Sequence, residues 1–246
     1  MSRRTLLRPV ALRGVGLFSG VACSVRLGPG SPGAGWRWRV GGAWHRLGPE
    51  QLAPLPRRSR LVAGADALVL PEHLLGALVM ADVDDVDVDA PDGEVPLLDG
   101  SALPFVRALI HAGLDAAPGR LRVEVTWQGQ TVAWAGGFGP ARARTFIAGP
   151  AARAARDAGL FPGARPRSAL VLDGQTRLLG GRGRRLPSEP AWHKLLDLLG
   201  DLGAYRALGP FEGTLSAHDP SHDRNPALIE AALHRGTLRR PLDRAA

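Results

Sequence analysis

The stretch "PAWHKLLDLLGDL", residues 190–202, constrains the fold more than any other part of the chain. At 100° per residue, His193, Asp197 and Asp201 fall within about 80° of one another on one stripe of a helix. Leucines cover the other faces, at Leu195, Leu196, Leu198, Leu199 and Leu202. A helix of this kind must bury its leucines against another layer. The polar stripe has two interpretations: it is an ordinary face in contact with solvent, or His193 and Asp197 are two metal ligands one turn apart. The spacing of these residues alone favours the solvent-exposed face.

Composition indicates a globular protein whose basic charge is carried by arginine. Of the 246 residues, 45% are hydrophobic and 22% charged, and the formal net charge is +8. Lys194 is the only lysine, and the arginines are scattered. Short arginine runs at 57–58, 182–185 and 239–240 are predicted to be solvated loops. With no basic stripe that interleaves aromatic residues, we expect no nucleic-acid partner, while a small anionic substrate fits the charge.

The cysteine content indicates a protein of a reducing compartment. Its one cysteine, Cys23, cannot form an internal disulfide. The first 14 residues lack the apolar core of a signal peptide, and no window approaches the roughly 20 apolar residues of a membrane span. We therefore expect a cytoplasmic monomer with no integral membrane segment and at most a transient contact with a membrane surface.

Hydrophobic periodicity predicts strands and helices in both halves of the chain. In the first half, strands are expected at 22–30, 35–40 and 59–64, an acidic strand within 82–91, and helices at 71–81 and 100–114. In the second, strands are expected at 121–127, 131–135, 168–174 and 209–217, and helices at 150–160, 190–202 and 225–236. The similar order suggests an α+β fold of two related domains, 1–117 and 118–246, with a linker near 116–119.

Three short motifs supply side chains for metal-dependent hydrolysis. "PEHLL" places Glu72 beside His73 at a helix start, where the histidine can bind zinc while the glutamate acts as a base. His193 and Asp197 add two ligands, and His222 in "SHDRNP" follows a strand and precedes a helix. Each motif alone is weak, and His218 is predicted to be an ordinary loop residue. Together they make a three-ligand site with an open position, a base and an acid, suited to hydrolysing an amide or ester.

The order of the motifs identifies a family. "RTLLRPVALRGVGLFSG", "PEHLLGAL", "DAPDGEVPLLDGSALPFV", "RARTF", "HKLLDLLGDL" and "SHDRNPALI" follow one another along the chain. In this order they resemble the UDP-3-O-acyl-N-acetylglucosamine deacetylases, zinc amidases of lipid A synthesis, almost from end to end. The resemblance implies two two-layer α/β sandwich domains packed helix face to helix face. The first domain would carry Glu72 and His73, and the second Thr145, His193, Asp197 and His222.

The resemblance also implies a role for each matched residue. The implied zinc ligands are His73, His193 and Asp197, with Fe(II) as the alternative metal, and the implied general base is Glu72. The other implied site residues are Thr145 on the amide carbonyl, Phe146 near the sugar, His222 at the leaving nitrogen, Asp201 orienting His222, and Lys194 reaching the substrate. A lone lysine in an arginine-rich chain suggests a position where a guanidinium does not fit. The implied partner is a UDP-linked acylated amino sugar.

Departures from the family pattern leave a second function open. The family's histidine in "GVGLHTG" is Phe18 here, and the chain is shorter between Trp134 and Arg142, where relatives carry strands that hold the uridine. The alternative is therefore a zinc-binding relative with weak or altered activity, acting on another N-acetyl sugar or as a binding or regulatory protein. Glu72, Thr145 and His222 favour the enzyme, because a pure binding protein needs no general base.

Overall fold

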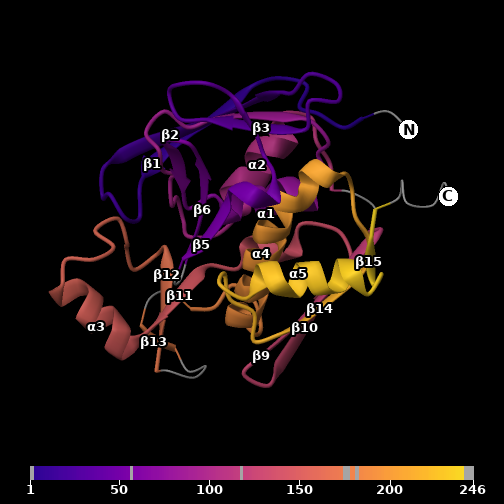
Figure 1. The fold of residues 1–246 in the computed structure, drawn as a ribbon. Helices are drawn as coiled ribbons and strands as arrows, with labels where there is room; N and C mark the ends of the chain where they lie inside the picture. The colour runs from indigo at the N-terminus through magenta and orange to yellow at the C-terminus, as the bar shows by residue number, and fades with distance from the viewer. Residues whose placement is uncertain (1–2, 56–57, 117–118, 174–177, 181–182, 241–246) are drawn as a thin grey trace.

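A computed structural model describes residues 3–55, 58–116, 119–173, 178–180 and 183–240. The fold is α+β, as predicted, and its layers run sheet, helices, helices, sheet (Figure 1). The elements of the first half are β1 (Val10–Val15), β2 (Ala22–Pro29), β3 (Trp36–Arg39), β4 (His45–Arg46), β5 (Leu52–Leu55), β6 (Arg58–Ala63), β7 (Asp66–Val69), α1 (Glu72–Met80), β8 (Val86–Asp89) and α2 (Leu103–His111). Those of the second half are β9 (Leu121–Trp127), β10 (Gln130–Trp134), β11 (Thr145–Ala148), α3 (Gly149–Asp157), β12 (Ala169–Leu172), β13 (Leu178–Gly180), α4 (Glu189–Ala204), β14 (Glu212–His218), α5 (Asn225–His234) and β15 (Leu238–Arg239).

Each half has one main sheet and one small sheet. The main sheets have the orders β1-β2-β8-β3-β4 and β10-β9-β14-β15, and the small ones are β5-β6-β7 and β11-β12-β13. The small sheet of the second half and α3 project to one side of the molecule, below the ends of β1 and β2 in Figure 1. Each half therefore has a small sheet next to the helices that carry the candidate site.

The acidic stretch forms strand β8, and arginines neutralise its outer face. Val86 and Val88 are buried, whereas Asp87 and Asp89 point outward. The parallel register of β3 and β8 sets Arg37 opposite Asp87 and Arg39 opposite Asp89, with ion-pair distances of 2.7 and 2.8 Å. Paired arginines, rather than water alone, therefore cover this face.

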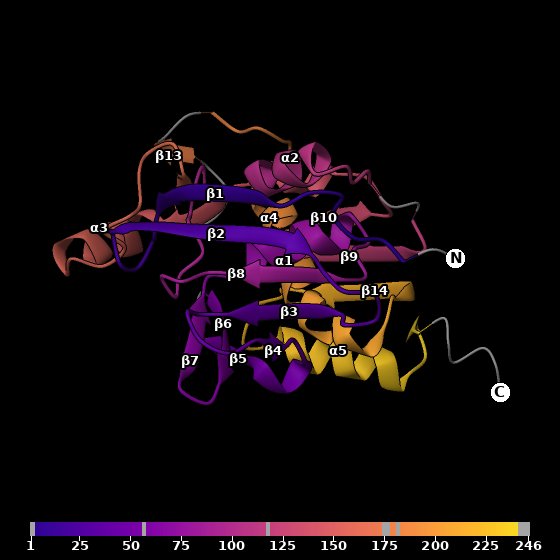
Figure 2. The same ribbon diagram turned by 90° about the horizontal axis from the view of Figure 1, so that it is seen from above.

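Helices α1 and α4 pack face to face at the centre of the molecule, as both views show (Figure 2). Two glycines permit the close approach. An added Cβ on Gly76 would lie 2.8 Å from Leu196 Cδ1, and one on Gly200 would lie 2.2 Å from the Glu72 carbonyl oxygen. The leucines of α4 are buried, and so are His193, Asp197 and Asp201 of its polar stripe. The polar stripe therefore faces the other half of the protein and not solvent.

Some sequence predictions were incomplete or wrong. Periodicity did not predict strands β1, β4, β5, β7, β13 or β15. Arg58 lies half-buried in β6 with its guanidinium 4.0 Å from the centre of the Phe18 ring, although a solvated loop was predicted. Arg185 is also half-buried, in an ion pair with Asp99.

Other predictions fall partly outside the described residues. These include Arg57, Arg182 and part of the linker at 116–119, so the division into 1–117 and 118–246 stays a prediction. Among the helices that the structure describes, none combines the length and apolar character needed to cross a bilayer.

Candidate active site

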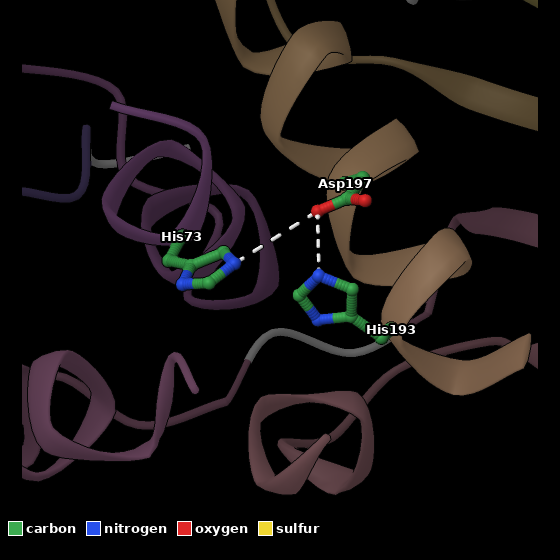
Figure 3. Close-up of side chains that lie close together, drawn as sticks. All are labelled: His73, His193 and Asp197. Atoms are coloured by element: carbon green, nitrogen blue, oxygen red, sulfur yellow. Dashed lines mark ion pairs between the residues drawn. The ribbon is translucent and has the colours of Figure 1, made fainter. Parts of the chain in front are cut away.

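A cluster of His73, His193 and Asp197 lies where α1 meets α4 (Figure 3). The Asp197 Oδ1 atom is 3.3 Å from His193 Nε2 and 3.8 Å from His73 Nε2. The two imidazole rings stand almost perpendicular, with centroids 5.1 Å apart. One potential ligand atom from each residue lies within 4.8 Å of the others, and all three residues are about 4% exposed.

These separations fit a single metal ion. Nitrogen and oxygen ligands bind zinc at about 2.0–2.1 Å, so two ligands of one tetrahedral ion are separated by about 3.3 Å. Burial lowers the pKa of His73 and of His193 to about 3. Both imidazoles are consequently neutral at physiological pH, which is the form that binds a metal.

The start of α1 brings Glu72 and His73 into the site. Leu70, just before it, has a φ of 61°, a conformation uncommon for a side chain of this size. Pro71 follows with φ −78°, close to helical geometry, so the chain turns sharply and the helix begins at once. This turn brings Leu70, Glu72 and His73 to one cavity.

A buried ion pair anchors the start of α4. Arg144 and Glu189 are 1% and 0% exposed, and Arg144 Nε donates to Glu189 Oε1 at 2.9 Å. The backbone N–H groups of Arg144 and Arg185 also donate to this carboxylate. Burial acts to raise the pKa of Glu189, but the hydrogen bonds from Arg144 and these N–H groups outweigh it and lower the pKa. The pair ties α4 to the residue just before Thr145 and so fixes strand β11 beside His193.

Glu72 has the character of a buried acid–base group. It is 2% exposed, and its Oε2 atom has no hydrogen-bond partner among the described residues. Burial raises its pKa to about 8, which the charge of His222 opposes and that of Asp197 reinforces. An unpartnered carboxyl oxygen beside three potential ligands fits a site that holds a metal and its water.

Asp201 holds His222 in the cavity beside Glu72 and Asp197. Its Nδ1 atom lies 2.9 Å from Asp201 Oδ2, while its Nε2 atom lies 3.8 Å from both Glu72 Oε1 and Asp197 Oδ2. Burial acts to lower the pKa of His222, but the carboxylates of Asp201 and Asp197 outweigh it and raise the pKa to about 10. His222 is therefore an imidazolium at neutral pH, with Nε2 directed into the cavity.

Two residues of this network had no role assigned from the sequence. Ser59 Oγ donates to Asp201 Oδ1 at 2.5 Å and lies 3.0 Å from His222 Nδ1. Asn225 Nδ2 donates to Asp201 Oδ2 at 2.8 Å. Asn225 lies in "SHDRNP", three residues after His222, so a signal for it existed. Ser59 is remote in sequence from both partners, and no local pattern marks it.

All nine site residues predicted from the sequence lie in or beside one cavity of about 310 Å³. Eight of them line the cavity, and Asp201 lies behind His222. Lys194 Nζ is 3.9 Å from Asp197 Oδ2 and 5.6 Å from the centre of the Phe146 ring. Phe146 in turn contacts the His193 ring edge-to-face at 5.8 Å. Thr145 is the first residue of β11, and its backbone N–H donates a hydrogen bond to the Gly100 carbonyl oxygen at 2.8 Å.

Apolar side chains also line this cavity. They are Leu17, Phe18, Leu97, Ile147, Ala148, Phe161, Ala164 and Ala169, called the apolar lining below. Phe18 and Phe161 meet edge-to-face at 5.5 Å, which joins the β1–β2 turn to the loop after α3. The arrangement suits a ligand with one polar end and one hydrocarbon end.

A carboxylic acid, a charged histidine and a buried His–His–Asp cluster around one cavity are characteristic of metal-dependent hydrolases. The family model of UDP-3-O-acyl N-acetylglycosamine deacetylase matches residues 3–135 and 139–234. The chain belongs to this family.

Curated relatives match the chain over most of their length. A UDP-3-O-acyl-N-acetylglucosamine deacetylase of Phenylobacterium zucineum is 31% identical, with 94% of this chain and 93% of the relative covered. The same enzyme of Acidithiobacillus ferrooxidans is 30% identical, with 95% and 90% covered. That of Synechocystis is 30% identical, with 80% and 87% covered.

The relatives carry residues that this chain lacks. The alignment to the Phenylobacterium protein runs over 277 positions, although it contains only 94% of the 246 residues of this chain. The family match is interrupted at residues 136–138, within the segment between Trp134 and Arg142 where the sequence predicts a shortening.

Proposed function

We propose that the protein is a zinc-dependent amidase that removes acetate from UDP-3-O-acyl-N-acetylglucosamine in lipid A biosynthesis. One observation carries the proposal: His222 Nε2 lies 3.8 Å from the Glu72 carboxyl and 3.8 Å from Asp197, across a single cavity. A base, an acid and a metal ligand thus lie side by side on the wall of a cavity of about 310 Å³, which is large enough for an acetamide group.

His73, His193 and Asp197 would hold the metal. A bound zinc ion supplies Lewis-acid chemistry and makes water more acidic, and Fe(II) is the alternative that these ligands also accept. The neutral imidazoles and the unpartnered Glu72 Oε2 atom fit such an ion.

The remaining side chains divide the proton transfers and the binding. Glu72 takes a proton from the attacking water, and the positive charge of a bound metal would lower its pKa from about 8 toward the ionised form that a base needs. The Thr145 hydroxyl donates to the carbonyl oxygen where negative charge develops. His222, already charged and oriented by Asp201, donates a proton to the leaving nitrogen, so that acetate and a free amine result.

Lys194 and Phe146 would bind the sugar end of the substrate. They lie together in the wall of the cavity, where an ammonium above an aromatic ring suits an anionic or hydroxyl-rich group. The apolar lining would receive the acyl chain, whose hydrocarbon matches Leu17, Ile147 and Phe161.

A second candidate function is deacetylation of an N-acetyl sugar without UDP. The shortening that the sequence predicts between Trp134 and Arg142 favours it, and the interruption of the family match at residues 136–138 is in line with that prediction. The chemistry at Glu72 and His222 would be unchanged, and only the group bound beyond the sugar would differ.

The experiment is a deacetylation assay with metal-loaded protein and UDP-3-O-acyl-N-acetylglucosamine. Glu72→Gln is expected to lower kcat by about a hundredfold to ten-thousandfold while metal binding is retained, because Glu72 is a base and not a ligand. Glu124→Gln, a change at a partly exposed position of β9 outside the cavity, is the matched control and should leave turnover unaffected.

Each outcome separates the candidates. Turnover of the UDP substrate that is lost in Glu72→Gln supports the proposal. Turnover of the acylated N-acetyl sugar alone, without UDP, supports the second candidate. A protein that binds metal but hydrolyses neither substrate is not this deacetylase, and a protein that binds no metal contradicts the assignment of the site.

A further inference from the structure

Ser59 is a buried serine whose hydroxyl lies between the two members of the Asp201–His222 pair. It is 1% exposed, and its Oγ atom lies 2.5 Å from Asp201 Oδ1 and 3.0 Å from His222 Nδ1. Ser59 belongs to β6, in the small sheet of the first half, whereas Asp201 lies on α4 and His222 just before α5. The network therefore depends on the docking of the two halves.

The hydrogen bonds leave one consistent placement of protons. Asp201 Oδ2 accepts hydrogen bonds from Asn225 Nδ2 at 2.8 Å and from His222 Nδ1 at 2.9 Å. Ser59 has a single hydroxyl proton, and the short contact assigns it to Asp201 Oδ1. The serine lone pairs then face the N–H at Nδ1 of His222, and Nε2 is left facing the cavity.

We propose that Ser59 is a positioning residue that holds Asp201 and His222 in the orientation that directs His222 Nε2 at the reacting group. The catalytic consequence rests on the proposed function. Without the hydroxyl, Asp201 Oδ1 would lose its donor in a place that is 0% exposed, and the imidazole would lose one of its two Nδ1 contacts. The ring would then rotate more freely about the single remaining bond to Asp201.

The test compares Ser59→Ala with Ser59→Thr, which keeps the hydroxyl and suits a strand. Ser59→Ala should lower kcat by about tenfold to a hundredfold with KM unchanged, since the lost bond acts through His222 rather than on substrate binding. Ser59→Thr should restore most of kcat. Ser101→Ala is the matched control, because Ser101 is equally buried and its Oγ donates to Asp99, outside the cavity.

A second measurement does not depend on turnover. In protein labelled with ¹⁵N-histidine, the Nδ1 proton of His222 is identified by its loss in His222→Gln, and its exchange with water is measured by NMR. Exchange should accelerate about tenfold in Ser59→Ala and stay at the wild-type rate in Ser59→Thr and Ser101→Ala. If Ser59→Ala folds poorly, Ser59→Cys takes its place in the test. Cysteine is nearly the same size as serine but a weak hydrogen-bond donor, so the same fall in kcat and the same faster exchange are expected.

The two measurements separate this inference from the proposed function. A lower kcat with faster Nδ1 exchange, both rescued by threonine, supports the role of Ser59. Unchanged kcat and unchanged exchange in Ser59→Ala overturn it. If the wild-type protein hydrolyses no substrate, the proposed function fails, and the exchange rate alone decides whether Ser59 positions His222.

Discussion

Gly200 lies directly against the carbonyl oxygen of Glu72. A Cβ atom on Gly200 would lie 2.2 Å from that oxygen and 2.8 Å from the Glu72 Cα. The glycine of one helix therefore fixes how close α4 approaches the backbone that carries the proposed base and the first proposed metal ligand, His73.

Gly200→Ala is expected to destabilise the protein and to disturb the site together. The added methyl meets backbone, which cannot rotate away, so α1 must shift at Glu72 and the free energy of unfolding should fall by about 1–3 kcal/mol or more. Gly76→Ala is the comparison, because its methyl meets the flexible end of Leu196 at 2.8 Å and should cost less. Urea denaturation measures both. Equal stability of the two variants would contradict the importance of the Gly200 contact.

Removing one partner of the Arg144–Glu189 pair is expected to be strongly destabilising. Glu189→Gln leaves the guanidinium buried without a counter-charge, at a cost of about 3–5 kcal/mol. The folded-state pKa of Glu189 is lowered, so its stabilising contribution is fully present above the unfolded pKa near 4.5 and is lost as pH falls through the lower folded value.

Denaturation of the wild type and of Glu189→Gln at several pH values below 5 tests this linkage. The difference in unfolding free energy between the two proteins should shrink as the pH falls. A difference that stays constant down to pH 2 would show that folding does not lower the pKa of Glu189.

Metal binding is expected to resist mild acid. Two histidines with an ordinary pKa near 6.5 would weaken metal binding by roughly a hundredfold between pH 7.5 and 5.5, because protons compete for both nitrogens. With pKa values lowered to about 3 by burial, His73 and His193 stay neutral over this range, so protonation of these two residues should weaken binding very little. Competition with a chelator of known pH dependence measures the affinity. A hundredfold loss by pH 5.5 would mean that the two histidines are solvated in the free protein.

Lys194→Arg is expected to impair turnover although it keeps the charge. The ammonium lies 3.9 Å from Asp197 and above the Phe146 ring, with 19% of the side chain exposed, which leaves little room for a planar guanidinium. We expect kcat/KM to fall by about tenfold or more, with metal content unchanged. Arg107→Lys on the exposed side of α2 is the reverse control and should be neutral. Full activity in Lys194→Arg would indicate that the site does not require a lysine at this position and that the single lysine is there by chance.

Much of the local structure followed from periodicity. Strand β9 occupies the predicted residues 121–127, and α1, α4 and α5 lie within one or two residues of their expected starts. These elements are regular enough for local pattern to mark them. Strands β5 (LAPL) and β7 (DALV) show no alternation of polar and apolar residues, unlike the equally short β3 (WRWR) and β8 (VDVD), so periodicity could not mark them.

The sequence by itself determined the helix that carries His193 and Asp197, and the motif order that marks the family, because both are properties of residues close together in the chain. It left open whether the polar stripe of α4 faces solvent. Only the tertiary structure decided that, by packing α1 against α4 and burying Asp197 and Asp201. It also brought Ser59 to His222 across a separation of 163 residues. Local periodicity reports the phase of one helix or strand, whereas the partner of a buried polar group depends on which surfaces come together when apolar faces are buried.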